Sequence, residues 1–209
     1  MYVQLGFDAN DVANYMAKEI DYNVNSRKAN EIREYTLSDD LLNMLSTMVN
    51  TVSDKLSDNK MLMDQHDQSK YYFFYLAVDT NSYWDHKWQL SALFPSMGLS
   101  RRFHHAYGEI DIPYDVWSNI HFGAIGRYCD FDELILLLAS DGAQFIHNAK
   151  SLSFKGDPES DKHAINIGFA IYNEFVKNNK QVNANDMLDK IMNNPVFIYY
   201  FKTGEFKDE

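Results

Sequence analysis

Apolar residues recur at intervals of three and four along most of this chain, which is the spacing of one buried helix face. Residues 8–34 show this spacing first, with Asp8 or Asn10 placed to cap the helix, and the polar stretch 23–30 predicts a break in it. A second helix is expected over residues 41–52. The apolar positions of these two segments are Val12, Tyr15, Met16 and Ile20, and then Leu41, Leu42, Leu45, Met48, Val49 and Val52.

After the second helix the chain changes from polar to strongly apolar. Residues 53–70 are rich in Asp, Asn, Lys and Ser, and we expect a solvated connection that carries His66 at the surface. Residues 70–79 are apolar on all sides, which fits a buried strand or a buried helix, and the helical neighbours favour a helix. In the following Trp84-Asp85-His86-Lys87, Asp85 is placed to cap a helix. The same four residues also bring together an indole, a carboxylate, an imidazole and an amine.

Residues 95–112 are expected to form a long loop, with a small β-hairpin inside it as the alternative. Long loops in compact domains are uncommon and are often functional. The adjacent histidines His104 and His105 would point in different directions and make a poor metal pair, so an exposed flap is the predicted structure. The loop also carries Gly98, Arg101, Arg102 and Gly108.

The least polar long run, residues 113–144, predicts two consecutive helices that meet near Asp130. One face of the first helix carries a carboxylate, an amide and two glycines at intervals of three or four residues. Glycine inside a helix costs roughly 1 kcal/mol relative to alanine, so two on one face indicate a close approach, by another helix or by a ligand. The four residues of that face are Asp115, Asn119, Gly123 and Gly126.

A later helix is predicted over residues 157–178, with Asp157 at its cap and Pro158 at its first position. Asp161 lies one turn in, on the same side as Ile165 and Gly168. A carboxylate on the inward face must be paired with a cation, bind a ligand or take part in chemistry, because burying an unpaired charge is costly. The remaining tail predicts a short helix, capped near Asn183 or Asn185, and an aromatic stretch, Val196 to Phe201.

Composition supports a folded, mostly α protein made of a single compact multi-helix domain over residues 1–209. Hydrophobic residues make up 45% and aromatic residues 15% of the 209 positions, and only four are proline. The single cysteine, Cys129, excludes an intramolecular disulfide and a cysteine-based metal site. No signal peptide and no apolar run of membrane-spanning length are visible, so no membrane insertion is expected.

The formal net charge of −11 makes binding to long nucleic acids less expected, because such proteins neutralise phosphates with a basic stripe. Here Arg101 and Arg102 are the only adjacent arginines. There is no Walker-type loop, no HExxH motif and no serine elbow. The profile therefore fits hydrolysis by general acid–base catalysis, with no cofactor. Asp141, Asp157 and Asp161 with His121 could supply the ligands of a metal site, but they do not form a metal-binding motif in the sequence.

Four motifs in sequence resemble the polymorphic toxin type 44 family, over about residues 23–172. The resemblance implies a secreted antibacterial toxin domain with a family-like core over about residues 23–178 and a C-terminal extension over residues 179–209. The motifs are Trp84-Asp85-x-Lys87, Asn119-x-His121-x-Gly123-x-x-Gly126, Gly142-x-Gln144, and Asp157-x-x-x-Asp161 with Gly168.

The resemblance also implies partners and a location. A cognate immunity protein would hold the toxin inactive in the producer's cytoplasm, and a secretion-system carrier would deliver it into target bacteria without a signal peptide of its own. We expect Asp85, His121, Asp157 and Asp161 to be catalytic. The expected substrate-binding residues are Trp84, Lys87, Asn119, Gly123 and Gln144.

The residues leave three functions open. In the first, two carboxylates among Asp85, Asp157 and Asp161 flank a glycosidic bond of the peptidoglycan glycan strands, one protonated and one ionised. In the second, an RNase, His121 and an acidic partner would share the acid and base roles, while Lys87 and Arg101 or Arg102 stabilise the phosphorane. In the third, the chain is a non-catalytic binding module. The first is ranked slightly above the second.

Overall fold

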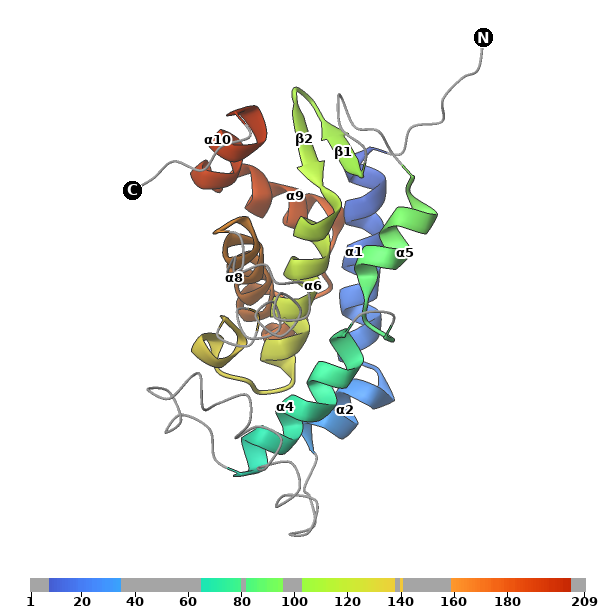
Figure 1. The fold of residues 1–209 in the computed structure, drawn as a ribbon, viewed down its shortest axis with the longest axis vertical. Helices are drawn as coiled ribbons and strands as arrows, with labels where there is room; N and C mark the ends of the chain where they lie inside the picture. Colours follow the sequence, from blue (N-terminus) through green and yellow to red (C-terminus); the bar gives the residue numbers. More distant parts are fainter. Residues whose placement is uncertain are drawn as a thin grey trace, which may run out of the picture.

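A computed structural model describes residues 8–34, 65–79, 82–95, 103–137, 140 and 159–203 of the chain. This part is mostly helical, as the sequence predicts, and the strands it contains form one small antiparallel hairpin (Figure 1). In chain order the elements are α1 (Ala9–Val24), α2 (Arg27–Arg33), α4 (Gln65–Val78), α5 (His86–Leu93), β1 (His104–Tyr107), β2 (Ile110–Pro113), α6 (Tyr114–Tyr128), α8 (Glu159–Glu174), the 3-10 turn η1 (Val176–Asn178), α9 (Ala184–Met192) and α10 (Pro195–Thr203).

The N-terminal segment forms two helices, α1 and α2, with the predicted break between them. Asp8 caps α1 and, together with Asp11, completes a capping box, in which each side chain accepts a hydrogen bond from the other's backbone N–H. After the turn at Asn25, the Ser26 side chain accepts from the Ala29 N–H and starts α2. Each helix therefore begins where a polar side chain satisfies the free N–H groups of its first turn.

The apolar run at residues 70–79 is helical, as expected, but α4 begins at Gln65. The predicted solvated connection over residues 53–70 is therefore wrong for its last six residues. Phe74 and Ala77 are buried in α4 while Leu76 is 45% exposed, so one helix face packs on the core. Apolar residues on the outer side obscured this amphipathic pattern in the sequence.

The predicted alternative of a small hairpin is confirmed as β1–β2, but the prediction of an exposed flap is wrong, because every residue of β2 is buried. Strand β2 leads directly into α6. The strands pair from His104 with Pro113 to Tyr107 with Ile110, around a turn in which Gly108 has a φ of +59°. Buried Ile110 and Ile112 fix β2 to the core, which places the start of α6.

Helix α6 packs most extensively on α8, at a crossing made by two glycines. A Cβ atom on Gly123 would collide with the Ile165 carbonyl, and one on Gly168 would collide with the Ile120 carbonyl. The close approach inferred from the glycine spacing is therefore between two helix backbones. Figure 1 shows α6 between α8 on one side and α1 and α5 on the other.

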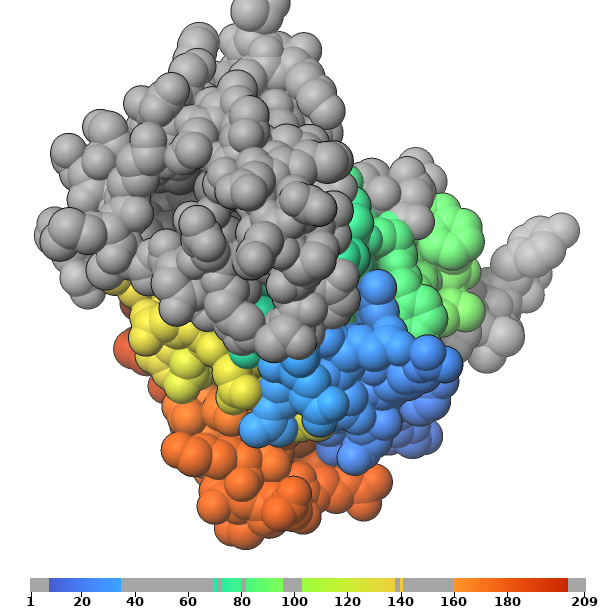
Figure 2. Space-filling model, turned by 90° about the horizontal axis from the view of Figure 1, so that it is seen from below, coloured from blue at the N-terminus to red at the C-terminus, as the bar shows by residue number. Residues whose placement is uncertain are grey.

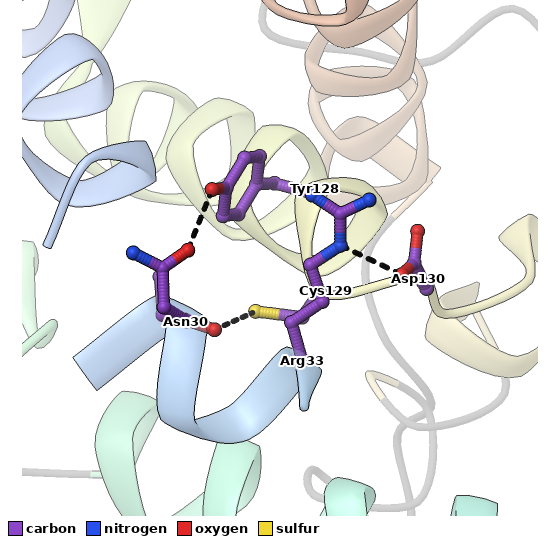
Figure 3. A network of polar contacts seen from close by, with 6 residues as sticks. Asn30, Arg33, Tyr128, Cys129 and Asp130 are labelled. Carbon is purple, nitrogen blue, oxygen red and sulfur yellow. Dashed lines mark hydrogen bonds and ion pairs between the residues drawn. The ribbon is translucent and has the colours of Figure 1, made fainter. Parts of the chain in front are cut away.

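Polar contacts join α2 to the C-terminal end of α6 (Figure 3). Tyr128 donates its hydroxyl hydrogen to Asn30 Oδ1 at 2.8 Å, and the Cys129 thiol faces the Ala29 carbonyl at 3.8 Å. Arg33 Nε donates to Asp130 Oδ2 at 2.9 Å. Together with the packing of α1 on α6, these contacts fix the N-terminal helices on the central one.

The C-terminal helices cover the other end of the molecule. Asn183 caps α9 with a second capping box, formed with Asp186, and the aromatic stretch predicted in the tail is α10. Phe197 is fully buried in α10 and contacts the ring of His163 on α8. No helix among the described residues is both long and apolar enough to span a bilayer.

Several predicted features lie outside the described residues. They are the helix over residues 41–52, Gly98, Arg101, Arg102, Asp141, Gln144, Asp157 and Pro158. The second helix of the central run is described over residues 133–137.

Candidate functional site

The described site residues fall on two sides of α6. Trp84 and His121 meet on the side that faces α1 and α5, with ring centroids 6.2 Å apart, and Asp85 follows Trp84 directly. Asn119, Gly123 and Asp161 belong to the side that faces α8, because Gly123 forms the helix crossing and Asn119 lies one turn before it. Since α6 separates the two groups, they cannot all act on one bond.

Two buried histidines form the centre of the first group. His86, the first residue of α5, and His121 of α6 are 0% and 1% exposed, and their ring centroids are 4.1 Å apart in an edge-on arrangement. The ring centroid of Tyr15 from α1 lies 6.3 Å from that of His86. The pair is therefore enclosed by three helices.

Both histidines are uncharged at neutral pH. Burial lowers the pKa of His86 to about 4, against a smaller opposite effect of Gln89 and of the Asp85 carboxylate. Neither ring nitrogen of His86 has a hydrogen-bond partner among the described residues. Burial, with a further contribution from His86, holds the pKa of His121 well below its usual value.

Asn23 connects His121 to a carboxylate on α1. Its Nδ2 atom lies 3.0 Å from His121 Nε2 and donates to Glu19 Oε2 at 3.4 Å. An amide nitrogen carries two hydrogens and can only donate, so His121 Nε2 accepts and the ring proton is on Nδ1. Asn23 is 1% exposed, and its amide is thus oriented by the neutral imidazole.

Glu19 is a half-buried carboxylate whose pKa is raised by desolvation, against the weaker effect of the Asn23 hydrogen bond. Its charge also raises the pKa of Tyr15 and of Tyr83. Tyr83 is two residues before Asp85, so both carboxyl groups lie around the turn that leads into α5. Asp85 caps that helix, and its Oδ1 accepts from the Lys87 N–H at 3.1 Å.

An open cleft of about 830 Å³ adjoins this group. Tyr22 and Tyr83 line it, with 63% and 56% of their surfaces exposed, and a hydrogen bond to Tyr22 raises the pKa of Tyr83. Figure 2 shows the blue surface of α1 and α2 continuing into the green surface of α5. The other lining residues are Asp21, Asn25, Ser26, Arg27, Lys28 and Glu31.

The second group lies along the α6–α8 contact. Asp161 is 4% exposed on α8, one turn before Ile165, which meets Gly123. Asn119 lies one turn before Gly123, and its buried Nδ2 has no hydrogen-bond partner among the described residues. A small polar region therefore begins where the close crossing ends.

Three residues of the first group are not among those predicted for the site: Glu19, Asn23 and His86. A signal for two of them exists in the sequence, because Tyr15, Glu19 and Asn23 follow one another at intervals of four on a single face of α1. Nothing in the sequence indicates that this face meets His121. Among the described residues, no three His, Cys, Asp or Glu side chains are grouped to hold a metal ion.

Comparison with known proteins gives one match. Residues 73–174 match the family model described as bacterial toxin 44, which covers the C-terminal part of α4, α5, the hairpin, α6 and α8. No curated protein and no solved structure matches the chain. The helices α1 and α2, which carry Glu19 and Asn23, precede the matched segment.

Proposed function

Through residues 73–174 the chain belongs to the bacterial toxin 44 family, and we propose that it is an antibacterial effector domain that hydrolyses peptidoglycan glycan strands by general acid–base catalysis. In this proposal the domain includes α1, α2 and the C-terminal helices as well as the matched segment. A cognate immunity protein protects the producer, and a secretion-system carrier delivers the toxin into competing bacteria.

The observation that carries this proposal is the chemistry around the open cleft. Its exposed rings are the tyrosines Tyr22 and Tyr83, and Asp85 stands at the helix start that follows Tyr83. Carboxyl groups are the acids and bases of most glycoside hydrolases. We assign Asp85 the role of the base that activates water, with its carboxylate oriented by the Lys87 N–H.

The buried state of His121 supports the glycan over the RNA alternative. A ribonuclease acid or base must reach the reacting hydroxyl or phosphate within hydrogen-bond distance. His121 is 1% exposed and uncharged at neutral pH, so its ring would have to leave the core to do so. Arg27 and Lys28 at the cleft are the feature that favours RNA, as cations that could contact phosphate.

The carboxylates on the α8 side have a separate place in the proposal. Gly123 takes no part in substrate binding, because the α8 backbone packs directly against it. Asp161 would line a second part of the substrate path near Asn119, and we assign the same role to Asp157 and Gln144, which lie outside the described residues. They would bind or orient the glycan and would not act on the bond that Asp85 attacks, because α6 lies between Asp85 and Asp161.

Expression in two bacterial compartments tests the function. The chain is produced in the cytoplasm or, with an added export signal, in the periplasm, beside an Asp85→Asn variant. Asparagine also caps helices, so this variant loses the carboxylate and keeps the helix start. Asp132→Asn is the matched control, because Asp132 Oδ1 accepts from the Leu134 N–H in the same local arrangement.

We expect killing only after export, its loss in Asp85→Asn and its retention in the control. Killing from the cytoplasm with degradation of RNA would instead identify a ribonuclease. Equal killing by all three proteins would make Asp85 dispensable and favour a non-catalytic binding module.

A further inference from the structure

We propose that Glu19 of α1, outside the segment that matches the family, is the catalytic acid of the proposed glycan hydrolysis, and that the Tyr22–Tyr83 cleft holds the sugar rings. The inference rests on the proposed function and names the second carboxyl group that such a reaction needs. It is carried by the position of Glu19, which contacts the buried Asn23–His121 pair and lies one turn before Tyr22, a residue that lines the open cleft.

The first step is the placement of Glu19. Tyr15, Glu19 and Asn23 occupy successive turns of one face of α1. Tyr15 donates its hydroxyl hydrogen to Gln89 of α5 at 2.8 Å, and Asn23 contacts His121 of α6. Contacts one turn before and one turn after Glu19 therefore fix its backbone against both helices.

The second step is the orientation of its carboxyl group. The neutral His121 ring takes one hydrogen of the Asn23 amide and leaves the other for Glu19 Oε2. The described part of the chain offers Glu19 no ion pair with a lysine or arginine. Burial raises the pKa of this carboxyl group, against the weaker opposite effect of the Asn23 hydrogen bond, and a raised pKa is what a carboxyl proton donor needs.

The third step is the approach of the substrate. Tyr22 is three residues after Glu19, so the two side chains are neighbours on the helix surface. Tyr22 and Tyr83 expose more than half of their surfaces and line the cleft together. Exposed aromatic rings provide apolar faces for the C–H groups of a sugar ring, and Asn25 and Asp21 offer polar partners for its hydroxyl groups.

The reaction then uses one molecule of water. Glu19 gives its proton to the glycosidic oxygen, and the bond from that oxygen to the anomeric carbon breaks, so one sugar leaves as an alcohol. Asp85 takes a proton from water, whose oxygen bonds to the anomeric carbon. Glu19 is left ionised and Asp85 protonated, and exchange with solvent restores both. His121 and Asn23 act as positioning residues in this scheme.

The test compares Glu19→Gln with the wild-type chain on two substrates. One is purified peptidoglycan sacculi, where new reducing ends are counted. The other is an aryl glycoside of N-acetylglucosamine or N-acetylmuramic acid whose acidic phenol leaves without protonation. Glu174→Gln is the matched control, because Glu174 is also a helix glutamate, lies outside the cleft and pairs with Lys190 at the surface.

We expect Glu19→Gln to lose about a hundredfold or more on sacculi and less than about tenfold on the aryl glycoside. The control is expected to retain wild-type rates on both. Thermal unfolding of Glu19→Gln should match the wild type, since glutamine keeps the size and the acceptor oxygen for Asn23. A Tyr83→Ala variant gives an independent measurement, because it removes one of the two cleft rings. We expect this variant to bind sacculi more weakly than the wild-type chain in a sedimentation assay.

The outcomes separate the inference from the function on which it rests. If wild-type chain releases reducing ends and folded Glu19→Gln releases them equally fast, Glu19 is not the acid and the proposed function stands. Equal losses on sacculi and on the aryl glycoside would also overturn the acid role. If the wild-type chain releases none, the proposed function fails and this inference fails with it.

Discussion

At the residue scale, the buried histidine pair makes stability depend on pH. His86 has a folded-state pKa of about 4, and that of His121 is also lowered, whereas an unfolded chain binds these protons near the ordinary histidine pKa of 6.5. The unfolded state thus binds more protons below 6.5, and stability falls as the pH falls from 6.5 toward 4. In this range each buried histidine lowers the free energy of unfolding by up to about 1.4 kcal/mol for each pH unit.

Chemical denaturation between pH 7.5 and pH 4.5 measures this effect. We expect the free energy of unfolding of the wild-type chain to fall steeply below pH 6.5, and less steeply in a His86→Gln variant. A pH dependence that is the same in both chains would show that His86 takes up its proton in the folded state.

His121 gives a prediction that separates positioning from catalysis. Because its Nε2 atom only accepts a hydrogen bond from Asn23, His121→Gln can supply a carbonyl oxygen in its place, whereas His121→Phe cannot. We expect the glutamine variant to retain most glycan hydrolysis, and the folded phenylalanine variant to lose about tenfold or more on sacculi but little on the aryl glycoside. Equal losses in both variants, on both substrates, would contradict a positioning role.

Cys129 is buried where α2 meets the C-terminal end of α6. Burial, reinforced by the Asp130 charge, raises the pKa of its thiol to about 12. The thiolate is the reactive form, so we expect a thiol reagent at pH 8 to react at least about a hundredfold more slowly with the native chain than with the denatured chain. Fast labelling of the native chain would show that the contact of α2 with α6 opens readily.

At the scale of elements, the α6–α8 crossing depends on Gly123 and Gly168. Alanine at either position would place Cβ against a backbone carbonyl, so the helices would have to separate. We expect each variant to lose about 1–3 kcal/mol or more of unfolding free energy. Gly126→Ala is the control, with a smaller loss, because its Cβ would meet only the Leu136 side chain, which can rotate. Equal losses in all three, measured by thermal unfolding, would contradict this account.

Local signals explain which elements could be predicted from the sequence. Asp8, Asp85 and Asn183 cap helices as their positions indicate, because capping is decided within four residues. The glycine spacing in α6 indicated a close approach, but the sequence could not tell a helix from a ligand as its partner. The sequence places the start of α4 too late, because residues 65–69 are polar and extend the helix beyond its apolar run.

At the scale of the whole molecule, the arrangement of α1, α5 and α6 decides which residues meet. Asp85 and His121 were predicted for one site and do lie on the same side of α6, but Asp161 lies on the other. Glu19 and Asn23 were not predicted, since the contact of Asn23 with His121 joins residues about a hundred positions apart along the chain. Such a contact follows from tertiary packing and leaves no local pattern.

The most direct test of the central claim is digestion of purified peptidoglycan sacculi, with mass spectrometry of the released fragments. The account predicts fragments in which one water has been added between two sugars while the cross-linked peptides stay intact. It also predicts that Asp85→Asn releases about a hundredfold less and Asp132→Asn as much as the wild-type chain. Intact glycan strands with the wild-type chain, accompanied by cleavage of peptides or of RNA, would contradict the account.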